Sequence, residues 1–114
     1  MVKVHYRVIW VPEQNMFSIT FKPLEEGASS GLWYLTPDNL IKMIERAEAQ
    51  MQAMDGQNRV NRSYCFEFLD KNNNDVHINL DHAGKECFEA VTDYMRQVYE
   101  SWKEYWKDKH ATKN

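Results

Sequence analysis

Residues 63–81, SYCFEFLDKNNNDVHINLD, decide the fold because they fit two different structures. Within them, the stretch 70–81 has Asp or Asn at its first, third, fifth and twelfth positions, as a helix–loop–helix calcium site does. Such a site also needs a glycine at the sixth position and usually a glutamate at the twelfth, where this chain has Asp75 and Asp81. Asn and Asp equally favour tight turns, because they tolerate left-handed backbone and bond to nearby N–H groups. The stretch therefore predicts a hairpin turn.

The residues on both sides of this turn alternate in polarity. Every second position is apolar, namely Tyr64, Phe66 and Phe68 before the turn and Val76, Ile78 and Leu80 after it. A period of two predicts strands with one buried face, and two such strands around a turn make an antiparallel hairpin. Asp81 then suits the N-cap of a helix, which we expect to run from about Ala83 to about His110.

The first half of the chain repeats this order. Residues 2–11, VKVHYRVIWV, and 16–22, MFSITFK, alternate as strands on either side of a short turn, and LWYL at 32–35 predicts an edge strand. A helix is expected after Thr36, because the threonine can cap it and the proline that follows fits the first helical position. Its apolar stripe recurs at spacings of three and four residues until Gly56, which favours a helix end.

These elements predict an α+β fold with the order ββαββα. Two hairpins that each bury one face need a common partner, so we expect one antiparallel sheet with both helices packed on one face and a long C-terminal helix. The sheet would have four strands, or five if residues 32–35 join it. A chain of 114 residues suits one α+β domain spanning 1–114, and we expect its last few residues to be disordered.

Composition narrows the classes of function. A net charge of −3 argues against a whole-protein electrostatic grip on nucleic acid or anionic membrane. No apolar run approaches the roughly 20 residues that span a bilayer, and the N-terminus lacks an apolar signal core, so we expect a cytoplasmic protein that does not enter the membrane. The two cysteines are too few and too far apart to predict a disulfide framework.

Catalytic and cofactor motifs are missing from the sequence. It has no nucleophile elbow, no phosphate-binding loop and no zinc-protease motif, and the serines of GASSG at 27–31 read as a linker. His5, Cys65 and His77 are zinc-type ligands on one predicted sheet face, but the closely spaced ligands typical of a zinc site are absent. We therefore expect no enzyme activity, no metal and no cofactor.

The end of the long helix is the first candidate binding site. A helix of about 28 residues is ~42 Å long. Strands of seven to ten residues span ~25 to 34 Å. The helix should overhang its sheet with Tyr99, Trp102, Tyr105 and Trp106 in the excess. These aromatic residues either extend the core or form a stripe that a partner covers, since Trp and Tyr are enriched at protein contacts.

The polar sheet face is the second candidate site. If the apolar sides of the strands face the helices, the opposite face carries His5, Arg7, Lys22, Glu67 and His77. This face is either the ordinary solvated side of the sheet or a recognition surface.

Together these features predict a non-enzymatic protein–protein interaction module. Its partner is either another protein or a second copy of the chain in a homodimer. Small acidic chains without a catalytic motif are often inhibitors, such as immunity proteins, antitoxins or phage anti-defence proteins of the anti-CRISPR kind. The alternative is a nucleic-acid-binding accessory protein that uses the lysines and aromatic residues of the C-terminal helix. Acidic residues interrupt those lysines, and lysines also suit a helix C-terminus, so nucleic acid is the less favoured partner.

Overall fold

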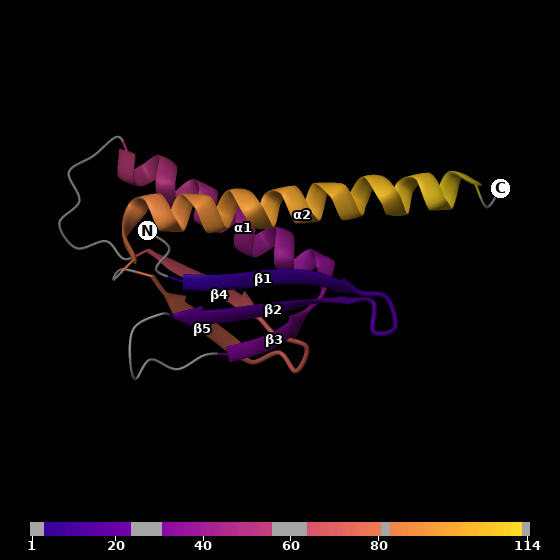
Figure 1. Cartoon of the computed structure of the whole chain (residues 1–114), viewed down its shortest axis with the longest axis horizontal. Coiled ribbons are helices and arrows are strands. Elements are labelled where there is room, and N and C mark those ends of the chain that lie inside the picture. The colour runs from indigo at the N-terminus through magenta and orange to yellow at the C-terminus, as the bar shows by residue number, and fades with distance from the viewer. Residues whose placement is uncertain (1–3, 24–30, 56–63, 81–82, 113–114) are drawn as a thin grey trace.

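The computed structural model describes residues 4–23, 31–55, 64–80 and 83–112, with side chains left undescribed at 23, 53–55 and 106–112. The predicted order of strands and helices is confirmed, including the short edge strand. The elements are β1 (Val4–Val11), β2 (Met16–Pro23), β3 (Gly31–Leu35), α1 (Pro37–Asp55), β4 (Cys65–Leu69), β5 (Asp75–Asn79) and α2 (Gly84–Thr112), as Figure 1 shows. The last two residues, predicted to be disordered, and Gly56, the predicted end of the first helix, lie outside the described residues.

The strands form two antiparallel sheets, in the orders β1-β2-β3 and β4-β5. The single sheet of four or five strands is therefore not confirmed. The hairpin of β4 and β5 meets β3 through a backbone hydrogen bond at its turn, where Lys71 N donates to Tyr34 O at 2.7 Å. Between the strands themselves, the rings of Trp33 and Phe68 pack edge to face with centroids 6.0 Å apart. At this junction β3 and β4 are joined by packing of side chains and not by a ladder of backbone hydrogen bonds.

Aromatic rings join the two sheets and α2 into one core. Phe66 of β4 stacks on Phe88 of α2 at 4.6 Å and lies 6.0 Å from Phe21 of β2. The inward parity predicted for the strands is confirmed, because Phe17, Ile19, Phe21 and Phe66 are buried while their strand neighbours are more exposed. Each buried phenylalanine removes a large apolar area from water, which is the main force that holds such a core together.

The turn between β4 and β5 has the chemistry predicted for it. Asp70 Oδ1 accepts hydrogen bonds from the backbone N–H groups of Asn72 at 2.8 Å and Asn74 at 2.9 Å, and Asn73 has a φ of 63°. The bond from Asn74 and then that from Asn72 lower the pKa of the Asp70 carboxyl group. Strands flank this turn on both sides, so the hairpin prediction is confirmed; Asp81 lies outside the described residues.

Both helices lie on the same side of the two sheets (Figure 1). Thr36 caps α1 as predicted, since Asn39 N donates to its Oγ1 at 3.2 Å. The helices are joined by Arg96 of α2, whose guanidinium bonds Glu48 of α1 at 2.6 and 3.0 Å. In the part of the chain that the structure describes, neither helix combines the length and the apolar character that crossing a bilayer requires.

The C-terminal part of α2 projects past the hairpin of β1 and β2, as Figure 1 shows. With 29 residues, α2 is the longest element of the fold. At about 1.5 Å per residue its length is roughly 43 Å, more than the eight residues of β1 can span. The predicted overhang of the second helix is thus present.

Candidate protein-binding surface

The three-stranded sheet turns one face towards the helices, and none of the described helices and strands covers the other (Figure 1). Strand register places the outward residues in rows across the sheet, since each pairs with the outward residue opposite. We call this surface the outer sheet face. Its rows are His5 with Lys22, Arg7 with Thr20 and Leu32, Ile9 with Ser18 and Tyr34, and Val11 with Met16.

One end of the outer sheet face is cationic. His5, Arg7 and Lys22 lie there, and with Tyr6 and Thr20 they line a shallow hollow of about 390 Å³. The rows of this face contain no Asp or Glu. Among the described residues, Arg7 and Lys22 have no ion-pair partner, whereas Arg96 has both Glu48 and Glu100. Positive charge therefore accumulates at this end without internal neutralisation by described side chains.

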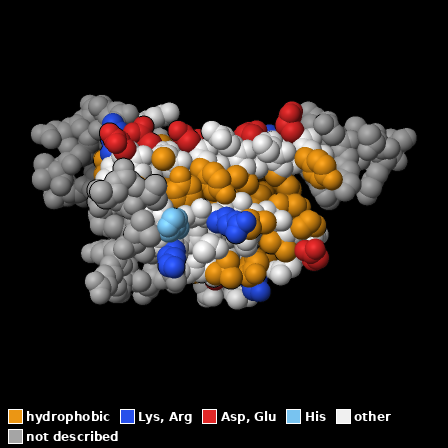
Figure 2. All heavy atoms as spheres, in the orientation of Figure 1, with side chains coloured by type: hydrophobic (Ala, Val, Ile, Leu, Met, Phe, Trp, Pro, Cys, Tyr) orange, Lys and Arg blue, Asp and Glu red, His pale blue; other side chains and the backbone are white. Residues whose placement is uncertain are grey.

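The middle and far end of the outer sheet face are apolar. Leu32 is 56% exposed and Ile9 is 42% exposed. Tyr34 stands in the same row as Ile9, and Lys71 Nζ lies 5.1 Å from the centre of its ring. Figure 2 shows hydrophobic side chains beside the Lys, Arg and His side chains on this side of the molecule.

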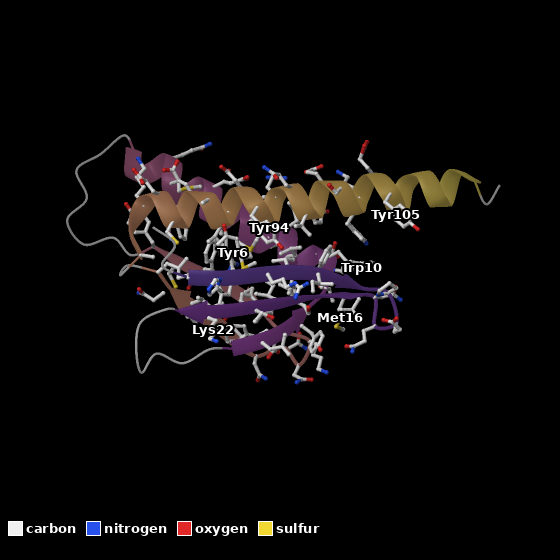
Figure 3. All side chains as sticks on the ribbon, in the orientation of Figure 1. Tyr6, Trp10, Met16, Lys22, Tyr94 and Tyr105 are labelled. Atoms are coloured by element: carbon white, nitrogen blue, oxygen red, sulfur yellow. The ribbon has the colours of Figure 1, made fainter. Side chains whose placement is uncertain are left out.

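The backbone edges of this sheet are engaged at two points. Val8 N donates to the hydroxyl of Tyr94 at 3.1 Å, and that hydroxyl donates to Val8 O at 3.4 Å, so α2 blocks the outer edge of β1 there. Figure 3 shows Tyr94 beside Tyr6, whose ring centroid lies 5.1 Å away. At the other edge, Tyr34 O accepts the bond from Lys71 N. A partner strand cannot pair with these particular groups without displacing Tyr94 or Lys71.

The structure divides the predicted polar face between the two sheets. His5, Arg7 and Lys22 lie on the outer sheet face, whereas Glu67 and His77 lie opposite each other on β4 and β5. There, His77 Nδ1 and Glu67 Oε1 are 3.1 Å apart. No group of three or more metal-type ligands occurs in the described ranges, where His5 and His77 stand on different sheets.

The aromatic residues of α2 separate into two groups. Trp102 packs on Trp10 at 5.0 Å and on Phe17 at 5.5 Å, and Tyr99 lies beside it at 5.7 Å. Tyr99 and Trp102 are thus half-buried, and burial raises the pKa of the Tyr99 hydroxyl. Tyr105, by contrast, is 60% exposed. The side chain of Trp106 lies outside the described residues.

Sequence reasoning placed the cations of the outer sheet face but not its apolar residues. The signal was present in strand β1, where Ile9 and Val11 share the outward parity of His5 and Arg7. Leu32 and Tyr34 had no such signal, since only the pairing of β3 with β2 places them on this face.

Comparisons of the chain with models of protein families, with curated proteins and with solved structures found no match. Functional inference therefore rests on the chemistry of the surfaces. The outer sheet face offers positive charge, hydrogen-bond donors and exposed aliphatic area. Such groups can form ion pairs, hydrogen bonds and apolar contacts with another molecule.

Proposed function

We propose that the protein is a non-enzymatic protein-binding module that docks through the outer sheet face. The observation that supports this most strongly is the exposure of Leu32 and Ile9 in the rows of Arg7 and Tyr34. Aliphatic area bordered by Arg and Tyr is typical of the centres of protein interfaces. An ordinary solvated sheet face would instead carry polar side chains at its outward positions.

The size of the face indicates that the interface extends beyond it. Two strands of eight residues and one of five, at about 3.3 Å per residue and about 4.8 Å between strands, cover roughly 330 Å². A stable interface takes about 800 Å² from each partner, so neighbouring surface has to contribute. Tyr105 lies on the C-terminal part of α2 (Figure 3), and its exposed ring is a candidate for such additional surface.

The proposed class is a small inhibitor or antagonist that acts by covering a surface its partner needs. Immunity proteins, antitoxins and phage anti-defence proteins work in this way, and the small chain without a catalytic motif fits them. Nucleic-acid binding through α2 has less support, because Glu100 and Glu104 flank Lys103 on its exposed surface. Those carboxylates would repel the negatively charged phosphate backbone.

A photo-crosslinking experiment in the cells of origin tests the proposal. A photoreactive residue at Leu32 should give a discrete protein adduct, whereas the same residue at Ala49, exposed on α1, should give none. Adducts at both positions alike, or adducts to nucleic acid alone, would contradict docking of a protein on the outer sheet face.

A further inference from the structure

The outer sheet face is positively charged, whereas the whole chain has a net negative charge. The chain has 17 acidic residues against 14 Lys and Arg, yet the rows of this face hold Arg7, Lys22 and His5 and no carboxylate. An interface selects its partner by complementary charge, so an excess of positive charge here favours a negatively charged partner surface.

The order of the rows along the strands gives the spacing of the complementary groups. Arg7 and Ile9 are two residues apart on β1 and therefore lie about 6.6 Å from each other along the strand. An extended segment that lies along β1 and β2 has the same repeat, because its residues i and i+2 point to the same side. Its acidic side chain would reach Arg7 and Lys22 while the side chain two residues away covered Ile9.

Resting on the proposed function, we infer that the outer sheet face binds an acidic protein segment with the pattern acidic–any–apolar. The carboxylate occupies the hollow between His5, Arg7 and Lys22, where Arg7 can donate two parallel hydrogen bonds. The apolar side chain packs on Ile9 in the next row, whereas Leu32 lies in the row of Arg7. Tyr94 occupies the backbone groups of Val8, and Lys71 N occupies Tyr34 O, which disfavours an added strand at these positions. The segment therefore lies across the side chains.

Two other occupants fit the face less well. Single-stranded nucleic acid needs several rings on which bases stack, and the rows of this face contain one aromatic side chain, Tyr34. A second copy of the chain would have to present an acidic surface such as exposed Glu100 and Glu104 on α2. That contact joins two different surfaces, and a head-to-tail contact of this kind builds rings or open chains.

Selection from a displayed library of random twelve-residue peptides tests the inference. Wild-type protein is the target, and Arg7→Glu protein removes peptides that bind elsewhere. The selected peptides should carry Asp or Glu with an apolar residue two positions away. By fluorescence anisotropy, the best peptide should bind Arg7→Glu and Lys22→Glu at least tenfold more weakly than wild type and bind Lys42→Glu equally well, because Lys42 is an exposed cation on α1.

Several results would overturn the inference. The inference fails if the selected peptides are not enriched in Asp or Glu. It also fails if the Arg7→Glu and Lys42→Glu proteins bind the best peptide with equal affinity. Tighter binding of oligothymidine than of the peptide would favour nucleic acid, and chain-like self-association that Arg7→Glu abolishes would favour a second copy. If Leu32 crosslinks to a protein but selection gives neutral peptides, the proposed function stands and the acidic pattern fails.

Discussion

Replacing Tyr94 with phenylalanine should destabilise the fold by opening the outer edge of β1. The hydroxyl of Tyr94 accepts a hydrogen bond from Val8 N at 3.1 Å and donates one to Val8 O at 3.4 Å. Phenylalanine keeps the ring contact with Tyr6 but removes both bonds, and a buried backbone group that loses its partner costs ~1–3 kcal/mol. Tyr94 is only half-buried, so water can satisfy part of the loss. We expect the free energy of unfolding to fall by about 1 kcal/mol.

Chemical denaturation, followed by far-UV circular dichroism, measures this change directly. The matched control is Tyr34→Phe, which should change stability by less than about 0.5 kcal/mol because phenylalanine retains the ring that faces Lys71. Amide hydrogen exchange adds a local measurement, since the Val8 amide should exchange about fivefold faster in Tyr94→Phe protein if ~1 kcal/mol is lost. Unchanged stability together with unchanged exchange at Val8 would refute the claim that Tyr94 closes this edge.

Three further predictions concern α2, the second hairpin and the junction of the sheets. Trp102→Ala should lower the free energy of unfolding by ~2–4 kcal/mol in denaturant melts, because the Trp102 ring packs against the edge of the core. Tyr105→Ala should lower it by less than ~1 kcal/mol, because Tyr105 is exposed. Equal effects of the two substitutions would contradict the separation of half-buried Trp102 from exposed Tyr105. The fold lowers the pKa of the Asp70 carboxyl group, so the stability that this group contributes is present at neutral pH and is lost as the pH falls through its unfolded and then its folded pKa. Asp70→Ala should therefore reduce the loss of stability between pH 7 and pH 3. An unaltered dependence of stability on pH would count against this role of Asp70. Gly31→Ala would place a methyl group in steric conflict with the Trp33 ring and displace it, so we expect a changed tryptophan emission spectrum and a loss of ~1–3 kcal/mol. A spectrum and stability like those of wild type would show that the ring is not packed there.

Local patterns predict the elements of this fold well. Alternation placed Phe17 and Ile19 of β2 inward, the Asn-rich stretch after Leu69 predicted a turn, and Thr36 predicted the start of α1. Each of these features depends on residues that are close in sequence, so single-sequence reasoning reaches them. The outward position of His5 and Arg7 followed from the same alternation.

Contacts between distant residues explain what the sequence could not predict. The division into two sheets depends on how Trp33 meets Phe68, and the closed edge of β1 depends on Tyr94, which is 86 positions from Val8. No periodicity reports such pairs. The same limit applies to the α2 aromatics, because only the packing of Trp102 on Trp10 distinguishes it from exposed Tyr105.

The affinity of the crosslinked partner for two matched variants tests the central claim most directly. Leu32→Asp places a charge in the centre of the outer sheet face, and Ala49→Asp places the same charge on exposed α1. Isothermal titration calorimetry should show at least a tenfold weaker complex for Leu32→Asp, which is about 1.4 kcal/mol, and an unchanged one for Ala49→Asp. Equal affinity of wild type, Leu32→Asp and Ala49→Asp would contradict docking through the outer sheet face.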